Sequence, residues 1–358
     1  KDNLDAATLS KAAIDAMYDA AKDSGDSLSA DILTEAAIDG MLKALGDPYS
    51  AYLSPHEYDM TMGDIEGQFE GIGAVVGLRE GRIIIVAPLP DTPAEREGIL
   101  PGDVILEVDG ASTEGWSLTE TVLKIRGLKG TTVRLRVQHE NAPESTYVDI
   151  VRGVIKLESV QWRMLPGGIA YVSISGFTES TNESLADALG EMKEQGAVGM
   201  VLDLRDNPGG LLSTTVEVAS QFLREGLVLY SIDGDGKRVD YPVEKGGSTP
   251  DTPLVVLVNG LSASGSEVLA AALQDHGRAV LIGTTTFGKG SVNTPKLLGN
   301  GSGLFFTIAR WYSPDGRLIE GKGLEPDIWV EEEPDGDRDP ALEKALEHLG
   351  ALVAAGSR

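Results

Sequence analysis

The chain of 358 residues contains no cysteine and only four histidines, and these absences limit the chemistry that it can perform. Without cysteine it can form no disulfide, no thiol nucleophile and no cysteine–metal site. The histidines show no metal-ligand spacing such as H-x-x-x-H; they are His56, His139, His276 and His348. Any hydrolytic chemistry would therefore have to proceed without a metal.

The chain also has no long apolar run and no excess of positive charge. No stretch approaches the roughly 18–20 apolar residues that a membrane helix needs. The 30 Lys and Arg residues stand against 56 Asp and Glu residues, which gives a net charge of −26 at pH 7. Nucleic acid and anionic lipid would be repelled by this charge. We therefore expect no nucleic-acid partner and no membrane span in this chain.

The length predicts two or three domains, and the residue pattern divides the chain into successive segments. Residues 1–66 form an N-terminal helical segment, with the amphipathic runs "AATLSKAAIDAMYDAAKD" and "ADILTEAAIDGMLKAL". Pro48 and Pro55 then interrupt regular structure. We interpret the segment as a small helical cap or a dimerisation arm.

Residues 67–157 have the pattern of a mostly β module. The runs "GRIIIVAP", "DVILEVDG" and "TTVRLRVQ" are rich in β-branched residues and are bounded by Gly, Pro or Asp. The run "SLTETVLKIRG" predicts a helix, with a capping-box pattern in Ser117 and Glu120. Its apolar face consists of Leu118, Val122 and Ile125. The module is thus predicted to be a small β fold with one well-capped helix.

Residues 158–332 alternate between strand-like and helix-like runs. The runs "GIAYVSIS", "VGMVLDLR" and "PLVVLVNG" are apolar throughout, and helical patterns lie between them. Such alternation predicts an α/β domain with a largely parallel, buried sheet. Residues 333–358 form a C-terminal linker and helix, in which the acidic stretch "EEEPDGDRDP" leads into "ALEKALEHLGALV".

The β module has features of a peptide clamp. Glycines in "FEGIG", which holds Glu70, Gly71, Ile72 and Gly73, allow consecutive N–H groups to point inward and hold an anion. A strand edge beside them, faced by the helix with Leu118 and Val122, would accept an extended peptide as an added strand. The alternative is a small β fold whose glycines only make turns.

Ser264 and Lys289 form a candidate nucleophile and base. Ser264 lies on the turn into a helix whose N-terminal N–H groups favour a developing oxyanion. His276 lies well down that helix, which leaves Lys289 as the base. Burial among the apolar residues of "LIGTTTFGKG", where no carboxylate occurs, would lower the lysine pKa. The alternative is a helix-capping serine and a lysine in a solvated turn.

The stretch "VGMVLDLRDNPGGLL" supplies candidate oxyanion donors. A buried strand runs into Gly209 and Gly210, and paired glycines there bring N–H groups into the crevice where α/β proteins bind ligands. An N–H of this pair, together with that of Gly265, could stabilise a tetrahedral oxyanion. An ordinary strand–helix turn is the alternative.

Several motifs occur in the order found in the C-terminal processing peptidases, which are tail-specific, PDZ-containing serine proteases of family S41. They are "ALGDPYSAYLSP", "FEGIG", "LDLRDNPGGLL", "SASGSEVLAAALQDHGRAVLIGTTTFGKGSV" and "GKGLEPDI", and the stretch "TPAEREGILPGDVILEVDG" is similar to the middle of a PDZ domain. The resemblance implies a multidomain α/β protein. It would have an α/β protease core with a ββα crossover, a mostly β PDZ domain and the N-terminal helical segment.

The resemblance also implies roles for individual residues. Ser264 would be the nucleophile and Lys289 the general base. The third catalytic member, usually glutamine, falls on Asn293, which is shorter by one methylene. A shorter amide would reach the lysine only through a shift or a water. Arg126 would help to register bound substrate, or would simply be a solvated cation at a helix end.

The function implied is that of an exported serine endopeptidase. It would cleave unfolded or C-terminally tagged polypeptides through a Ser–Lys dyad, with PDZ recognition of substrate C-termini regulating access and with no cofactor. The chain begins at Lys1 without a signal peptide, which favours a removed leader or a trimmed chain and an extracytoplasmic location. The helical ends favour a homo-oligomer. The alternative function, motivated by Asn293, is a catalytically impaired scaffold that binds peptides in its PDZ groove.

Overall fold

The computed structural model describes residues 5–24, 28–79, 81–139, 144–245, 247–249, 251–331 and 338–356. The chain divides into two compact units. One unit is Met62–Glu158, and the other combines the residues before Met62 with those from Ser159 onward. The linker expected in "EEEPDGDRDP" lies largely outside the described residues.

The larger unit contains a six-stranded sheet of order β10-β11-β12-β15-β16-β19. The first pair is antiparallel and every later pair is parallel. All five residues of β15 are buried, because a sheet covered on both faces requires a continuous apolar strand. The strands are β10 (Val160–Leu165), β11 (Ile169–Ile174), β12 (Gly199–Asp203), β15 (Leu254–Val258), β16 (Val280–Gly283) and β19 (Ile328–Trp329).

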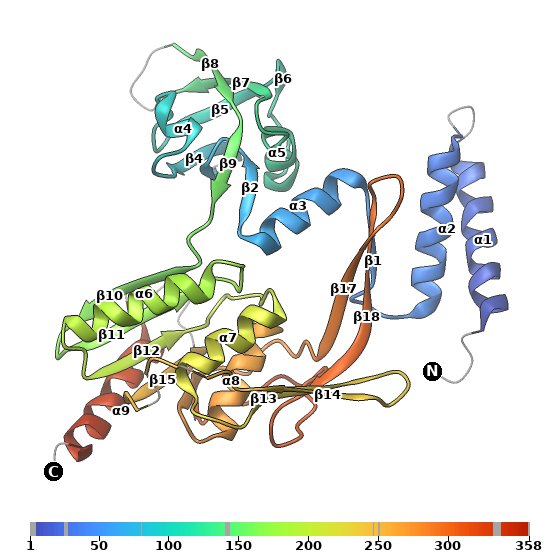
Figure 1. Ribbon diagram of the computed structural model, residues 1–358. Coiled ribbons are helices and arrows are strands. Elements are labelled where there is room, and N and C mark those ends of the chain that lie inside the picture. The colour runs from blue at the N-terminus through green and yellow to red at the C-terminus, as the bar shows by residue number, and fades with distance from the viewer. Residues whose placement is uncertain are drawn as a thin grey trace. The chain divides into compact units, whose positions relative to one another are not determined.

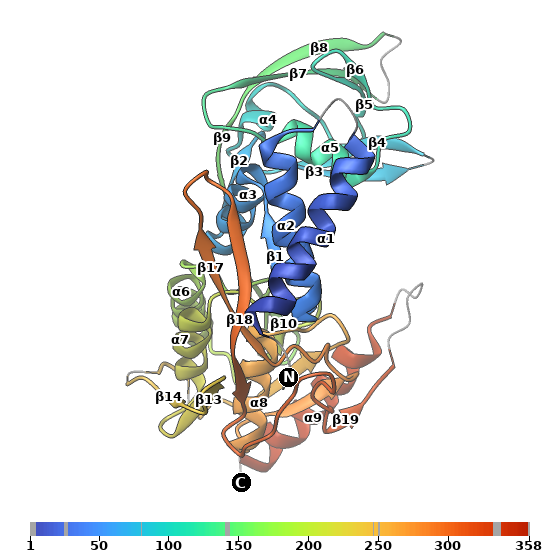
Figure 2. The ribbon, with the colours of Figure 1, turned by 90° about the vertical axis from the view of Figure 1, so that its right-hand side faces the viewer.

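Helices cover both faces of this sheet. Along β12, Leu202 packs in the core beneath three helices, and Val201 packs in a separate core beneath the C-terminal helix. This alternation follows from the period of two along a strand. Figure 2 shows the C-terminal helix on the side of the sheet away from α6 and α7. The helices are α6 (Thr181–Glu194), α7 (Leu212–Phe222), α8 (Gly265–Asp275) and, on the other face, α9 (Pro340–Gly356).

A second sheet in the same unit is built around one long strand, which pairs with three others. Two of its strands form an extended antiparallel hairpin (Figure 1). The short β1 adds to this sheet, which fixes the chain just after Tyr49. The strands are β1 (Ala51–Leu53), β13 (Leu227–Asp233), β14 (Arg238–Pro242), β17 (Ser291–Leu297) and the central β18 (Gly303–Tyr312).

The two predicted N-terminal helices are present as α1 (Ala6–Ser24) and α2 (Ala30–Leu45). They pack closely at Gly40, where an added Cβ would lie 2.5 Å from the carbonyl oxygen of Ala12. A third helix, α3 (Pro55–Glu66), is absent from the prediction. Proline is well suited to the first turn of a helix, so Pro55 begins a helix and does not only end the preceding structure. No helix in the described part of the chain is both long and apolar enough to cross a membrane.

The smaller unit has a sheet of order β3-β4-β5-β7-β8, with β6 paired to β5. A separate strand pair joins the two ends of the unit, because β2 pairs with β9. Ile85, Val133 and Leu135 are fully buried between this sheet and its helices. The elements are β2 (Gln68–Gly71), β3 (Ala74–Arg79), β4 (Arg82–Pro88), α4 (Pro93–Arg96), β5 (Val104–Val108), β6 (Ala111–Ser112), α5 (Leu118–Ile125), β7 (Thr132–Gln138), β8 (Thr146–Val151) and β9 (Gly153–Lys156).

Candidate active site

Ser264 lies where the loop after β15 enters α8, at the carboxyl edge of the parallel strands, where α/β folds place ligands. Its φ of 53° and ψ of −113° are unusual for a residue with a side chain. Such a conformation costs about 1–3 kcal/mol and persists only when the surroundings hold it. The side chain therefore stands at a helix N-terminus on a strained turn, which suits a nucleophile beside an oxyanion site.

Glu267 is the group that holds this turn. Its carboxylate is fully buried, and Oε2 accepts hydrogen bonds from the backbone N–H of Ser264 at 2.9 Å and of Lys289 at 2.8 Å. Two backbone nitrogens from segments far apart in sequence thus share one oxygen atom. Glu267 thus caps α8, and it is buried because the glycine-rich loop with Gly288 and Lys289 folds over the carboxylate.

The second oxygen of Glu267 completes the arrangement. Oε1 accepts from the N–H of Gly288 at 2.7 Å and from Thr286 Oγ1 at 2.6 Å. Thr286 Oγ1 in turn accepts from the N–H of Leu324 at 2.7 Å. A buried carboxylate is costly unless its lone pairs are satisfied, and here four donors satisfy them. Glu267 thereby fixes the serine turn and the lysine loop as one rigid element.

Lys289 is half-buried, and this burial lowers the pKa of its amine below the ordinary value. Three carboxylates, Glu320, Asp47 and Glu267, partly offset the shift by favouring the ammonium. The prediction that no carboxylate would act on the lysine is therefore wrong. Glu320 and Asp47 come from other segments of the chain, which local sequence does not disclose. The net effect is a lowered pKa, so the amine gives up its proton more readily than an exposed lysine does, as a general base requires.

Tyr49 lies next to Lys289 and is in turn contacted by Asn293. The lysine Nζ is 5.4 Å from the centroid of the Tyr49 ring. Asn293 Nδ2 donates to the Tyr49 carbonyl oxygen at 2.9 Å and to Thr307 Oγ1 at 3.3 Å. Its Oδ1 accepts from Ser291 Oγ at 3.0 Å. Within the described residues no hydrogen bond joins Asn293 to the lysine amine, so the amide reaches Lys289 only through Tyr49.

The loop after β12 brings its glycines against the serine turn. A Cβ added to Gly209, which has a φ of 102°, would lie 2.8 Å from both Ser264 Cβ and Gly265 N, so only glycine fits there. The N–H of Gly209 donates to Asn207 Oδ1 at 2.8 Å. The N–H groups of Gly210 and Gly265 have no acceptor among the residues that the structure describes. These two N–H groups are therefore free to bind an oxyanion.

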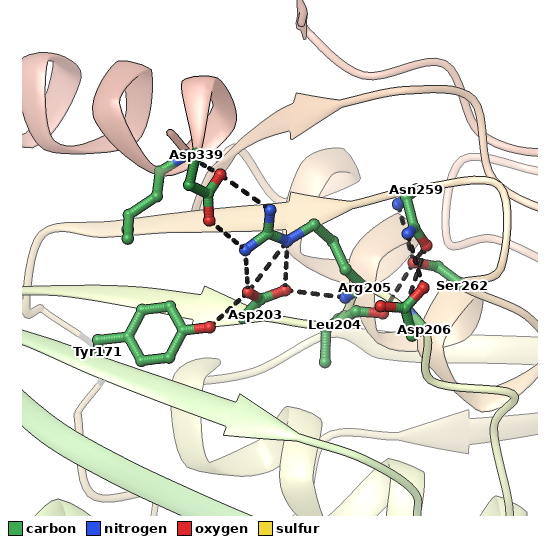
Figure 3. Close-up of polar contacts among 9 residues, drawn as sticks. Tyr171, Asp203, Leu204, Arg205, Asp206, Asn259, Ser262 and Asp339 are labelled. Atoms are coloured by element: carbon green, nitrogen blue, oxygen red, sulfur yellow. Dashed lines mark hydrogen bonds and ion pairs between the residues drawn. The ribbon is translucent and has the colours of Figure 1, made fainter. Parts of the chain in front are cut away.

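Further hydrogen bonds join the loop after β12 to the loop after β15 (Figure 3). Asp206 N–H donates to Asn259 Oδ1 at 3.0 Å, and Asn259 Nδ2 donates back to Asp206 Oδ1 at 2.9 Å. Ser262 Oγ donates to the Leu204 carbonyl oxygen at 2.7 Å. The Asn207 carbonyl oxygen accepts from Ser266 Oγ at 2.8 Å. The two loops that carry the glycines and the serine are thus fixed to each other.

The smaller unit presents an open strand edge. Among the residues that the structure describes, strand β3 pairs with β4 alone, and α5 packs against it. Exposed apolar side chains occur on both elements, Val75 and Leu78 on β3 and Leu118 on α5, with the partly buried Val122 one turn along. Ser117 caps α5 by accepting the N–H of Glu120 at 3.1 Å, which is one of the two hydrogen bonds of the predicted capping box. An edge strand beside an apolar helix face is suited to binding an extended peptide.

The loop before β3 has the features of a carboxylate-binding turn. Gly73 has a φ of 77°, and a Cβ there would lie 2.4 Å from Thr92 Cβ, so glycine is required. The carbonyl oxygens of Ile72 and Gly73 accept backbone N–H groups at 2.8 and 2.9 Å. The N–H groups of the same two residues have no acceptor in the described part of the chain. These N–H groups can therefore hold an anion.

Two other predicted residues of this unit make internal contacts. Glu70 Oε2 accepts the N–H of Lys129 at 2.8 Å, which fastens the loop after α5. The Arg126 guanidinium lies 4.4 Å from the centroid of the Phe69 ring, next to Gly71. Both residues thus make contacts within the unit, close in sequence or in space to the loop before β3. Across the described residues, no group of three or more His, Cys, Asp or Glu side chains could hold a metal ion.

Comparison with known proteins agrees with this architecture. A profile of peptidase family S41 matches residues 168–330, and a PDZ domain matches residues 60–138. The carboxy-terminal processing protease CtpA of Bacillus subtilis is 38% identical over 291 residues, which are 81% of this chain and 62% of that protein. The carboxy-terminal-processing protease of Bartonella bacilliformis is 39% identical over 293 residues, which are 80% of this chain and 67% of that protein.

Solved structures show the same fold. The photosystem II D1 C-terminal processing protease has a TM-score of 0.54 and 29% identity, with 92% of this chain and 94% of that chain covered. The chain belongs to peptidase family S41 and carries a PDZ domain. Within that family it is similar to the carboxy-terminal processing proteases. It spans 62% of the length of the Bacillus relative.

Proposed function

We propose that the chain is a serine endopeptidase that cleaves unfolded or C-terminally tagged polypeptides through a Ser264–Lys289 dyad. One observation carries the proposal: a single oxygen of buried Glu267 accepts the backbone N–H groups of both Ser264 and Lys289. A hydroxyl is a weak nucleophile until a base removes its proton. The lowered pKa of the Lys289 amine supplies a base that is neutral nearer to physiological pH.

The proposed reaction has two stages. Lys289 Nζ takes the proton of Ser264 Oγ while that oxygen attacks the scissile carbonyl carbon. The N–H groups of Gly265 and Gly210 stabilise the resulting oxyanion, and the Lys289 ammonium then protonates the leaving amine as the C–N bond breaks. Water, deprotonated by Lys289, then attacks the acyl carbon; the bond from that carbon to Ser264 Oγ breaks, the Lys289 ammonium returns the proton to Oγ, and the new carboxyl end is released. Gly209 joins the oxyanion site only if its N–H leaves Asn207 Oδ1.

Asn293 acts in this proposal as the third member of the site. Its amide holds the Tyr49 carbonyl oxygen, and the Tyr49 ring lies beside the Lys289 amine. Asn293 therefore orients the lysine through Tyr49, in place of a direct hydrogen bond. An aromatic ring face also favours the ammonium formed during the reaction.

The PDZ domain would recognise the C-terminus of the substrate. The C-terminal carboxylate would bind the N–H groups of Ile72 and Gly73, while the preceding residues add to the β3 edge and place a side chain against Leu118 and Val122. Glu70, Gly71 and Arg126 support the end of this groove. Occupancy of the groove would regulate cleavage.

A second function is a catalytically impaired scaffold that binds peptides through the same groove. The amide of Asn293 is engaged by Tyr49, Thr307 and Ser291, and the Gly209 N–H is engaged by Asn207, which supports this alternative. The test is incubation with casein, with and without Ser264→Ala and with an added C-terminal peptide. Fragments of casein that the wild type forms and Ser264→Ala does not form support the protease. Absence of fragments even with the peptide, combined with peptide binding, supports the scaffold.

We also propose an extracytoplasmic location, as the resemblance to the C-terminal processing peptidases implies. The N-terminal helices offer a surface for self-association, because Ile14 and Tyr18 lie one turn apart on α1 and are 64% and 66% exposed. A homo-oligomer through the helical termini would cover them. Light scattering of Ile14→Glu against wild type tests this, since a monomeric wild type contradicts it.

A further inference from the structure

The C-terminal helix α9 is part of the core that carries the active-site loops. Its Ala341, Ala345 and Leu349 recur every four residues and are buried against Val201 and Leu257 of the central strands. This spacing places the three residues on one helix face. The helix is thus seated on the face of the sheet opposite α8, which carries Ser264 at its start.

The first turn of α9 reaches the loop after β12 through one side chain. Asp339 caps the helix, since its Oδ1 accepts the N–H of Leu342 at 3.0 Å. The same carboxylate accepts Arg205 Nη1 at 3.0 Å and Arg205 Nη2 at 2.8 Å. Figure 3 shows the Arg205 guanidinium between Asp339 and Asp203. The residues paired in this contact are 134 positions apart in the chain.

Asp203 binds the other side of the guanidinium. Its Oδ2 accepts Arg205 Nη2 at 2.6 Å, and both its oxygens accept Nε at 3.0 Å. Tyr171 donates to the same carboxylate at 2.7 Å. Burial opposes the charge on Arg205, but the hydrogen bonds to Asp203 and Asp339 raise its pKa above the usual value. Arg205 therefore stays charged and is held from both sides.

Arg205 is followed directly by the strained part of the loop. Asp206 has a φ of 60°, although it is not glycine, and the next residues lead to Gly209 and Gly210. Such a conformation needs contacts that over-determine it. The pair with Asn259 holds Asp206 from one side. On the other side of Asp206, the backbone of Arg205 is anchored because its guanidinium is fixed between Asp203 and Asp339.

We propose that Asp339 is a positioning residue for catalysis, which holds the candidate oxyanion loop in place through Arg205. The inference rests on the proposed function and goes beyond it, because it makes the C-terminal helix part of the active-site scaffold. Without Asp339, Arg205 Nη1 loses its acceptor and Asp203 alone holds the guanidinium. The backbone from Asp206 to Gly210 would then relax, and the Gly210 N–H would leave the position at which an oxyanion forms.

The test variant is Asp339→Ser, because serine preserves the helix cap but is too short to reach Arg205. The matched control is Leu349→Ala, which weakens the seat of α9 at its far end and leaves the ion pairs intact. Two quantities are measured on the folded full chain: hydrogen exchange of the Asp206 and Gly209 amides, and steady-state cleavage of an unfolded polypeptide. Asp339→Ser should speed exchange by about tenfold or more.

Asp339→Ser should also lower kcat by about 100-fold with KM little changed, since a misplaced loop affects the transition state more than binding. Leu349→Ala should lower the thermal midpoint but change neither the exchange of the Asp206 and Gly209 amides nor kcat. Arg205→Lys should reproduce the loss in kcat. The double variant Arg205→Lys/Asp339→Ser should lower kcat little further, because both substitutions break the same contact between Arg205 and Asp339.

Unchanged exchange of the Asp206 and Gly209 amides in Asp339→Ser would overturn the inference, whatever the activity. An equal effect of Leu349→Ala would also overturn it, because helix seating alone would then be responsible. If the wild type cleaves nothing, the proposed protease function fails, and the exchange comparison still decides whether Asp339 holds the loop. The two proposals can therefore fail separately.

Discussion

The protease core and the PDZ domain place their candidate functional residues in opposite environments. In the core, Glu267 is fully buried and its two oxygens fix the backbone of the serine turn and the lysine loop. In the PDZ domain, Val75 and Leu78 are exposed on an edge strand that lacks a second partner strand within the described residues. Catalysis requires catalytic groups that are preorganised and partly shielded from water, whereas recognition of an extended peptide requires an open strand edge.

The comparison predicts that the two regions can be disabled independently. The largest effect is expected for Ser264→Ala, which removes the nucleophilic oxygen and the capping contact of that oxygen with the Glu267 backbone. Cleavage should fall by roughly 10⁶-fold, the scale found when a serine nucleophile is removed. Calorimetry should show a folded protein that has lost only the stability of one helix cap, about 0.5–2 kcal/mol, and titration should show unchanged binding of a C-terminal peptide. Residual full activity would place the nucleophile elsewhere.

Glu267→Gln tests the rigid element in the core. The amide keeps the shape of the carboxylate but replaces an acceptor oxygen with a donor, which would face two backbone N–H groups. We expect kcat/KM to fall by about 100-fold through misplacement of the dyad. The free energy of unfolding should fall by about 1–3 kcal/mol in urea titrations.

The control for this substitution is Glu191→Gln on the exposed face of α6, where the same chemical change should have no effect. An unaltered kcat/KM in Glu267→Gln would contradict the positioning role of Glu267. A loss of stability with normal kcat would limit Glu267 to a structural role.

Val122→Asp tests peptide binding by the open β3 edge and the α5 face of the PDZ domain. A carboxylate on the α5 face would oppose apolar side chains and the C-terminal carboxylate of a peptide. Peptide affinity, measured by fluorescence anisotropy, should weaken by about tenfold, or about 1.4 kcal/mol. Val151→Asp is a matched control, because Val151 is exposed on the opposite edge strand β8. Equal loss in both variants would mean that the groove does not bind the peptide.

The smallest effect is expected for Asn293→Gln. The longer amide restores the residue type that the resemblance to the C-terminal processing peptidases implies at this position. Activity on casein should equal or exceed that of the wild type, and any decrease should stay below about tenfold. A greater loss would show that the hydrogen bonds of Asn293 to Tyr49, Thr307 and Ser291 are built for the shorter side chain.

Local sequence predicted those parts of the fold that depend on neighbouring residues. The turn from β15 into α8 could be predicted because an apolar strand, small residues and a helical run follow one another around Ser264. The two N-terminal helices followed from their apolar spacing in the same way. Helix α3 was missed because Pro55 was interpreted as a breaker, although proline fits a helical first turn.

Contacts between distant segments could not be predicted in this way. Glu320 and Asp47 act on Lys289 only after β18 and β1 have brought their segments to it. The hydrogen bond of Asn293 to the Tyr49 carbonyl oxygen spans 244 positions. The residues next to Arg205 in the sequence did not predict its ion pair with Asp339. These interactions depend on the order of strands in the sheets, which a single sequence does not specify.

The central claim is that neutral Lys289 takes the proton of Ser264, and the pH dependence of kcat/KM tests it most directly. Burial disfavours the ammonium, so the amine loses its proton at a lower pH than an exposed lysine does. Activity should rise by about tenfold per pH unit and level off at a midpoint below the ordinary lysine value of 10.5. Lys289→Ala should remove both the activity and this rise. A midpoint at or above 10.5, or the same rise in Lys289→Ala, would contradict the account.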